Sequence, residues 1–289
     1  MERKRLVATI LLALLAIAWG AIPLIVREDI PVSHLVAMRV WLGALALLIA
    51  LALVRRLRWP PMHRGRLIAS GLILALHWGA FFAALKTTTV GVALAVLYLG
   101  PIAAAALAPR ILGEKVGARV KVGLAFAFAG VLIVVRPESG ATLEGVLWSL
   151  LAGATMAALM LVAKPAAEDL GGLVVAAGEL VIAAIVLTPW MGAAVANSME
   201  YWLEFLMLGV VLTGLAWMIY WHGMKYLPVA AVGVMMYLEP ASAMVWAALF
   251  LDERPGAVGW IGVALVIVGG VLAASESVAE EEIGVPAAL

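Results

Sequence analysis

The feature that most constrains this chain is a series of long apolar runs separated only by short charged or Pro/Gly-rich breaks. A helix needs about 20 apolar residues to cross the hydrocarbon core of a bilayer. Ten such runs lie near 6–26, 32–54, 67–85, 89–109, 117–135, 143–163, 171–191, 202–222, 228–250 and 256–275. Only 13% of the residues are charged, against about 25% in soluble domains. The sequence therefore predicts an all-α membrane protein with ten transmembrane helices, and it excludes a soluble enzyme and a nucleic-acid binder.

The Lys and Arg residues in the loops predict how the helices are oriented. Cytoplasmic loops of membrane proteins carry an excess of these cations. With a cytoplasmic N-terminus, 14 of the 19 cations fall on the cytoplasmic side, four fall on the other side, and Arg39 alone lies inside a span. We therefore expect both termini to be cytoplasmic. The acidic segment 276–289 is expected to be a disordered cytoplasmic tail.

The chain contains an internal repeat at a constant offset of 139 residues. The matching pairs include Lys86 with Lys225, Trp78 with Trp217, Tyr98 with Tyr237, Pro101 with Pro240, and Glu114 with Glu253. Identities of such uncommon residue types in one register predict two five-helix repeats, 1–140 and 141–275. Because five is odd, the second repeat must be inverted in the membrane. Inverted repeats are a design of transporters, whose substrate sites lie near the bilayer midplane between the repeats.

Two segments carry a resemblance to a known family. They are Tyr98-Leu99-Gly100-Pro101 ending in Gly113-Glu114-Lys115, and Tyr237-Leu238-Glu239-Pro240 ending in Leu251-Asp252-Glu253-Arg254, and Trp19-Gly20 in the first span also fits. The whole chain resembles the EamA-type ten-helix carriers of the drug/metabolite transporter superfamily, and within them it is most similar to the bacterial aromatic amino-acid exporters. The resemblance implies a 5+5 inverted-repeat fold, alternating access through a central cavity, and export of small metabolites across the bacterial inner membrane.

Ionisable residues deep in a span are costly and are therefore functional candidates. Glu179 can hold a substrate ammonium or carry a proton, or it can be a hydrogen-bonded Glu packed between helices. His77 offers one donor and one acceptor to a substrate. Its structural alternative is a helix-packing histidine bonded to a backbone carbonyl.

Glu239 and Arg39 are the other two ionisable candidates. Glu239 replaces Gly100 of the first repeat, and this departure from symmetry favours contact with an asymmetric substrate, although the Leu-Glu-Pro motif can also be structural. Arg39 is close enough to the predicted end of its span to snorkel to the surface. Its alternative role is to bind a carboxylate.

Proline and aromatic residues complete the predicted cavity. Pro101 and Pro240 each remove a helical hydrogen bond at mid-depth, and the freed backbone is tolerated where it is buried or lines a cavity. The predicted cavity residues are His77, Trp78, Tyr98, Pro101, Glu179, Trp217, Tyr220, Tyr237, Glu239, Pro240 and Trp19. Ordinary helix kinks and core packing are the alternatives. Gly123, Gly130, Gly262 and Gly269 predict close packing of the fifth and tenth spans at the periphery, or a dimer surface.

The motif inventory narrows the function. No phosphate-binding Gly-x4-Gly-Lys-Ser/Thr motif, zinc-protease motif or nucleophile elbow occurs, and the chain has no Cys and four scattered His, so we expect no catalytic residue, metal or cofactor. A scaffold or receptor would not account for paired mid-membrane prolines and ionisable residues. We therefore expect a secondary exporter of amino acids, with large hydrophobic or aromatic ones favoured. The alternative is an exporter of drugs or other small metabolites. Facilitated diffusion, proton antiport and the oligomeric state stay open.

Overall fold

The structure is a computed structural model that describes residues 2–25, 30–56, 61–134, 140–191, 201–250 and 256–282. Within these residues it contains helices and no strands. Of the predicted disordered tail 276–289, residues 276–282 are helical and residues 283–289 lie outside the described residues, as do Glu253 and the chain around it.

The helices follow the ten predicted apolar runs. They are α1 (Glu2–Trp19) with the 3₁₀ turn η1 (Ile22–Leu24), α2 (Val32–Leu53), α3 (Arg64–Thr87), α4 (Val90–Leu97) with α5 (Leu99–Ile111), α6 (Ala118–Val134), α7 (Leu143–Leu170), α8 (Gly172–Leu187) with η3 (Thr188–Trp190), α10 (Trp202–Leu206) with η4 (Met207–Leu215) and α11 (Ala216–Tyr226), α12 (Val229–Met236) with α13 (Leu238–Phe250), and α14 (Ala257–Glu282). The described residues include seven helices that are long and apolar enough to cross a membrane, and two shorter apolar helices. The predicted all-α membrane fold is confirmed.

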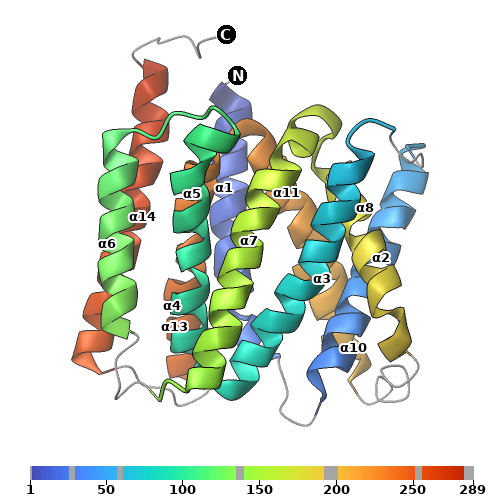
Figure 1. Cartoon of the computed structure of the whole chain (residues 1–289), viewed down its shortest axis with the longest axis horizontal. Helices are drawn as coiled ribbons and strands as arrows, with labels where there is room; N and C mark the ends of the chain where they lie inside the picture. The colour runs from blue at the N-terminus through green and yellow to red at the C-terminus, as the bar shows by residue number, and fades with distance from the viewer. Residues whose placement is uncertain are drawn as a thin grey trace.

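The helices run alternately up and down, and both termini lie at the same end of the bundle (Figure 1). The first helix of each half shows the inversion: α1 descends from the end that holds the termini, whereas α7 ascends from the opposite end. The packing follows the same relation, because α3 packs against α7 as α11 packs against α1, and α14 packs against α6. The cytoplasmic location of the termini stays a prediction.

Two spans are interrupted at the positions where the prolines predict a break. Helix α4 ends at Leu97 and α5 begins at Leu99, and α12 ends at Met236 and α13 begins at Leu238. Each break comes three or four residues before Pro101 or Pro240, at the carbonyl that each ring deprives of its partner. Both prolines are buried in protein rather than facing lipid.

The conserved spacing of glycines in the fifth and tenth spans is used inside the chain, where α6 packs against α14. A Cβ added at Gly130 would lie 2.5 Å from the carbonyl oxygen of Gly262, and one at Gly269 would lie 2.5 Å from that of Gly123. The prediction of close peripheral packing is therefore confirmed, and these glycines contact each other rather than a second copy of the chain.

Two helices differ from the sequence expectation. Helix α14 continues to Glu282, past the predicted end of the span at 275, and its last turns are rich in Ala and Glu, which are good helix formers. The eighth span contains a nine-residue π-helix, Met207–Leu215. In a π-helix the hydrogen bonds run from residue i to i+5, so its side chains are spaced differently around the helix axis from those of the matching α-helical segment of α3. Such segments are frequent at functional sites.

Candidate functional site

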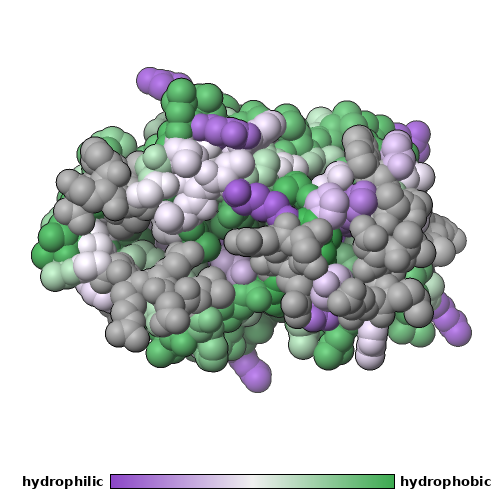
Figure 2. Space-filling model, turned by 90° about the horizontal axis from the view of Figure 1, so that it is seen from below, coloured by the Kyte–Doolittle hydropathy of each residue, from purple (hydrophilic) through white to green (hydrophobic). Residues whose placement is uncertain are grey.

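A cavity lies between the two halves of the bundle. Its lining consists of Trp19, Ile22, Arg39, His77, Trp78, Phe81, Leu97, Tyr98, Pro101, Met156, Trp217 and Glu239. The lining residues of α1, α2 and α3 lie toward the end of the bundle away from the termini, whereas Leu97, Tyr98, Met156 and Glu239 come from the middle of their spans. Figure 2 views that end, where green residues cover much of the perimeter and purple residues lie both at points of the edge and nearer the middle.

Arg39 is the cation of this cavity. Its side chain is only 2% exposed, and its guanidinium carbon lies 4.5 Å from the ring centre of Trp78 and 4.8 Å from that of Phe82. Nε donates to the Thr213 hydroxyl of the π-helix at 2.8 Å, whereas one terminal nitrogen, Nη1, has no hydrogen-bond partner. The expectation that Arg39 snorkels to the surface is wrong, because η4 and two aromatic rings enclose it.

Glu239 provides the anion. Its Oε2 accepts a hydrogen bond of 2.5 Å from the Tyr98 hydroxyl. The ring of Tyr98 packs on that of Tyr237 with centroids 5.1 Å apart, and the Tyr237 hydroxyl donates to the backbone oxygen of Tyr98 at 2.9 Å. Within the described residues no ion pair joins Glu239 to Arg39. The cavity therefore holds two opposite charges that do not neutralise each other directly.

His77 is fixed by the second half of the chain. Its Nδ1 lies 2.9 Å from the carbonyl oxygen of Ala152 and 3.3 Å from the Thr155 hydroxyl, both on α7. Its ring stacks on Phe81 with an interplanar angle of 11°. His77 was expected either to contact a substrate or to bond to a backbone carbonyl between helices. It bonds to the Ala152 carbonyl and also lines the cavity, so both roles are compatible.

The cavity wall is an aromatic cluster centred on Trp217. The ring of Trp217 stacks on Tyr220 at 5.0 Å and meets Trp78 at 5.5 Å and Trp19 at 5.9 Å. The indole nitrogen of Trp19 donates to the Leu212 carbonyl of the π-helix at 2.9 Å. Such ring contacts add about 0.5–1.5 kcal/mol each beyond their buried area, so the wall is rigid.

Glu179 lies behind this wall and not among the cavity-lining residues. It is fully buried, and its Oε2 accepts hydrogen bonds from the indole nitrogens of Trp217 at 2.6 Å and Trp221 at 2.7 Å. Its Oε1 and the Tyr220 hydroxyl have no hydrogen-bond partner. In this conformation Glu179 acts on the cavity by orienting Trp217.

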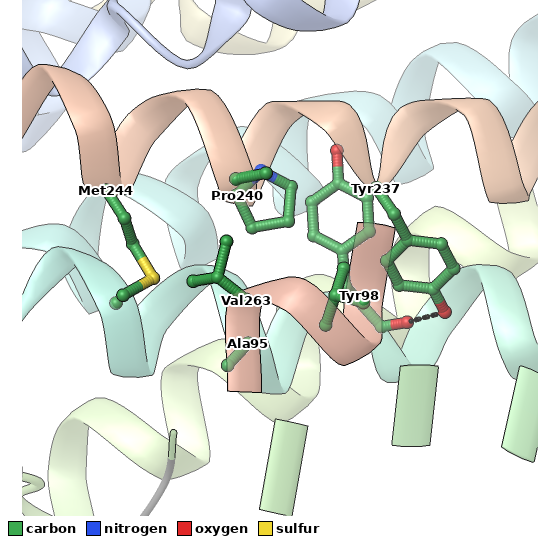
Figure 3. A pocket seen from close by; sticks show the side chains of 9 residues that line it. Ala95, Tyr98, Tyr237, Pro240, Met244 and Val263 are labelled. Atoms are coloured by element: carbon green, nitrogen blue, oxygen red, sulfur yellow. Dashed lines mark hydrogen bonds between the residues drawn. The ribbon is translucent and has the colours of Figure 1, made fainter. Parts of the chain in front are cut away.

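A second, smaller cavity lies beside the tyrosine pair. Figure 3 shows Tyr98 and Tyr237 beside Pro240, Met244 and Val263, with the hydrogen bond from the Tyr237 hydroxyl to the Tyr98 carbonyl. Its lining side chains are apolar apart from the two tyrosines. The tyrosine pair therefore separates a polar cavity from an apolar one.

The end of the bundle that holds the termini is closed by a buried ionic cluster. The amine of Lys164, near the end of α7, donates to the carbonyl oxygens of Met224 and Leu227 at 3.0 and 2.9 Å. It also pairs with Glu114 at 3.2 Å and Glu168 at 3.1 Å. Glu114 additionally accepts from the Val229 backbone nitrogen, which opens α12, at 2.9 Å. As expected, Glu114 holds neighbouring helix ends together.

The structure brings together most of the residues expected at the site. Seven of them line the larger cavity, namely Trp19, His77, Trp78, Tyr98, Pro101, Trp217 and Glu239. Tyr237 and Pro240 line the smaller one, whereas Glu179 and Tyr220 pack behind Trp217. Sequence reasoning missed Ile22, Phe81, Leu97 and Met156, which are unremarkable apolar residues in this composition. Among the described residues no cluster could hold a metal ion.

Comparisons with known proteins agree with this architecture. The model of the EamA-like transporter family matches residues 6–136 and again residues 143–275. The chain is 32% identical over 222 residues to the threonine/homoserine exporter RhtA of Salmonella typhimurium, covering 75% of this chain and 73% of that protein. It is 29% identical to RhtA of Escherichia coli K12 over 83% of this chain and 79% of that protein.

Two further similarities extend over most of the chain. The "Uncharacterized transporter YxxF" of Bacillus subtilis is 22% identical over 73% of this chain and 70% of that protein. A crystal structure superposes with a TM-score of 0.73 at 23% identity, covering 95% of this chain and 98% of the solved one, and it supports the fold. The chain belongs to the EamA-like transporter family, within the drug/metabolite transporter superfamily.

Proposed function

We propose that this protein is a secondary transporter that exports amino acids through the larger cavity by alternating access. The observation that carries the proposal is the arrangement of charges in the cavity. The Arg39 guanidinium has an unpartnered terminal nitrogen, and the Glu239 carboxylate lines the same space without pairing with it. A buried charge is costly unless it is paired, and Arg39 and Glu239 have the neutral hydroxyls of Thr213 and Tyr98 as hydrogen-bond partners rather than an opposite charge. A zwitterion supplies both partners at once.

In this proposal each charged end of an amino acid binds one side chain. Arg39 binds the carboxylate, because a guanidinium presents parallel N–H donors that match two carboxylate oxygens. Glu239 binds the ammonium, with its carboxylate held in place by the Tyr98 hydroxyl. The aromatic wall around Trp217 then contacts the substrate side chain.

The lining of the cavity favours large hydrophobic or aromatic amino acids. Seven of its twelve lining residues are Trp, Phe, Ile, Leu or Met, and pockets lined mainly by apolar and aromatic side chains favour apolar ligand groups. The names of the RhtA relatives favour a second candidate class, the small hydroxylated amino acids threonine and homoserine.

The alternating-access mechanism follows from the inverted halves and the closed end. In this conformation the ionic cluster around Lys164 closes the end that holds the termini, and the cavity lies toward the other end. With cytoplasmic termini in a bacterial inner membrane, the cavity lies on the external side of this cluster, and its lining residues are buried. Exchanging the conformations of the two repeats would move access from one side to the other.

Counterflow in proteoliposomes tests the function directly. Vesicles preloaded with unlabelled phenylalanine or threonine and given the labelled amino acid outside are expected to accumulate label transiently. Glu239→Gln and Arg39→Gln should each lower the rate at least tenfold, because each removes one charged partner, worth about 1.5–3 kcal/mol per hydrogen bond. Val245→Ala, at an exposed position on α13, is the matched control.

The same assay separates the competing functions. Counterflow of ethidium in place of every amino acid would support the drug-exporter alternative. Absence of amino-acid counterflow by folded wild-type protein would refute the proposal. Counterflow that proceeds at equal internal and external pH measures exchange alone, so net uptake with and without an imposed pH gradient then distinguishes a facilitator from a proton antiporter.

A further inference from the structure

We infer that His77 is a specificity-determining residue that selects substrates carrying a hydrogen-bond donor on the side chain, such as a hydroxyl. This inference rests on the proposed amino-acid transport and names a feature of its substrate. It is carried by the hydrogen bonds of the imidazole ring and by the inventory of polar groups in the larger cavity.

The first step is the direction of the hydrogen bond at Nδ1. The partner at 2.9 Å is the carbonyl oxygen of Ala152, which can only accept. The second neighbour, the Thr155 hydroxyl, donates its own proton to the carbonyls of Leu151 or Ala152 and so accepts from Nδ1 as well. Nδ1 therefore carries the proton. In a neutral imidazole this leaves Nε2 as an acceptor.

The second step is the position of Nε2. No hydrogen bond within the described residues reaches this nitrogen, and it is not among the buried polar atoms that lack a partner. Since His77 lines the larger cavity, Nε2 is open to it. Stacking on Phe81 and the bonds to α7 hold the ring in this orientation.

The third step is the inventory of the other polar groups. Arg39 only donates, and it is assigned to the substrate carboxylate. The Tyr98 hydroxyl already donates to Glu239, and Glu239 is assigned to the ammonium. His77 Nε2 is then a side-chain acceptor in the cavity that neither charged end of the substrate uses, so it is available to a third polar group. A donor satisfies it, whereas a methyl group of the same size leaves it unpaired, and a carboxylate meets an acceptor instead of a donor.

Isosteric pairs of amino acids test this selectivity. Threonine and valine differ by a hydroxyl in place of a methyl group, and tyrosine differs from phenylalanine by one hydroxyl. In competition counterflow we expect the hydroxylated member of at least one pair to bind about tenfold more tightly, the effect of one buried hydrogen bond. The wild-type ratio alone tests the inference, without any variant.

Two variants assign the selectivity to one nitrogen of His77. His77→Asn keeps a donor near the position of Nδ1 and removes the acceptor at Nε2, so the preference should fall to about unity while valine or phenylalanine is still bound. Thr155→Val is the matched control, because it alters the other neighbour of Nδ1 at 3.3 Å and leaves Nε2 in place. It should keep the preference.

The outcomes separate this inference from the proposed function. Amino-acid counterflow without any preference in either pair would overturn the role of His77 and leave amino-acid transport intact. A preference that survives in folded His77→Asn protein would overturn it as well. Absence of all amino-acid counterflow would instead refute the proposed function.

Discussion

Glu114 and Glu168 allow a sharp test of the closed end, because both pair with the amine of Lys164 at nearly equal distances, 3.2 and 3.1 Å. Their surroundings differ: the Glu114 side chain is 14% exposed and that of Glu168 is 49% exposed. Glu114 also accepts from the Val229 backbone nitrogen at the start of α12. Removing each carboxylate in turn therefore separates the effect of burial from the effect of distance.

The expected magnitudes follow from these contacts. Glu114→Ala removes a hydrogen bond to a buried cation, worth about 1.5–3 kcal/mol, and a helix cap, worth about 0.5–2 kcal/mol. We expect a loss of about 2–5 kcal/mol in the free energy of unfolding. Glu168→Ala removes an i,i+4 surface pair, for which about 0.3–0.5 kcal/mol is typical. Glu114→Gln keeps an acceptor for the Val229 amide and should be intermediate.

Thermal unfolding of the detergent-solubilised protein, followed by size-exclusion fluorescence, measures these losses. At roughly 2–4 °C per kcal/mol, Glu114→Ala should lower Tm by about 4–20 °C and Glu168→Ala by about 1–2 °C. Equal shifts for the two alanine variants would refute the reasoning, since they would show that neither burial nor the cap on α12 contributes. If Glu114→Gln is as unstable as Glu114→Ala, the hydrogen bond to the Val229 backbone nitrogen does not contribute to stability.

Three other predictions address packing, orientation and the buried carboxylate. Gly130→Ala places a Cβ 2.5 Å from a backbone oxygen of α14 and should cost about 1–3 kcal/mol in thermal unfolding, whereas Gly79→Ala, with nothing within 4 Å, should be neutral or slightly stabilising. The chain has no Cys, so single cysteines report which side of the membrane they face. Leu143→Cys should react with an impermeant maleimide in intact cells, and Met62→Cys only after lysis. The reverse pattern would show that the termini are not cytoplasmic. Glu179→Gln, which keeps an acceptor for both indoles, should preserve stability and the tryptophan emission spectrum. Glu179→Leu should shift the spectrum and lower Tm, and identical behaviour of the two variants would contradict the orienting role.

The fold was largely predictable from the sequence because the bilayer imposes a simple rule on it. Every backbone amide in a span must be satisfied within a helix, so apolar run length predicts the helices and the repeat predicts their inversion. The breaks at Tyr98 and Tyr237 followed from proline chemistry alone. The π-helix in the eighth span did not, because Met207–Leu215 reads like any apolar helical segment and its register change depends on packing.

The site was predictable only where residue chemistry carried a signal. Glu239, His77 and the tryptophans stand out in an apolar chain, and the structure brings them together. Arg39 was misread because distance along a helix says nothing about which face is covered, and the rings of Trp78 and Phe82 cover it. Glu179 was predicted to line the cavity because its position along the helix does not show which way it faces. In the structure its carboxylate accepts a hydrogen bond from Trp217 and does not line the cavity.

The repeat separates residues that build the frame from residues that recognise the ligand. At the offset of 139, the residues shared by both copies, such as Tyr98 with Tyr237, form the breaks and the contact between the halves. The charged and imidazole residues of the cavity are not shared, since Arg39 matches Gly178, His77 matches Ala216, and Glu239 matches Gly100. A frame that exchanges two conformations needs equivalent halves, whereas an amino acid has two different ends. Shared residues at the breaks and unshared charges in the cavity are therefore what the proposed alternating access to a zwitterion site predicts.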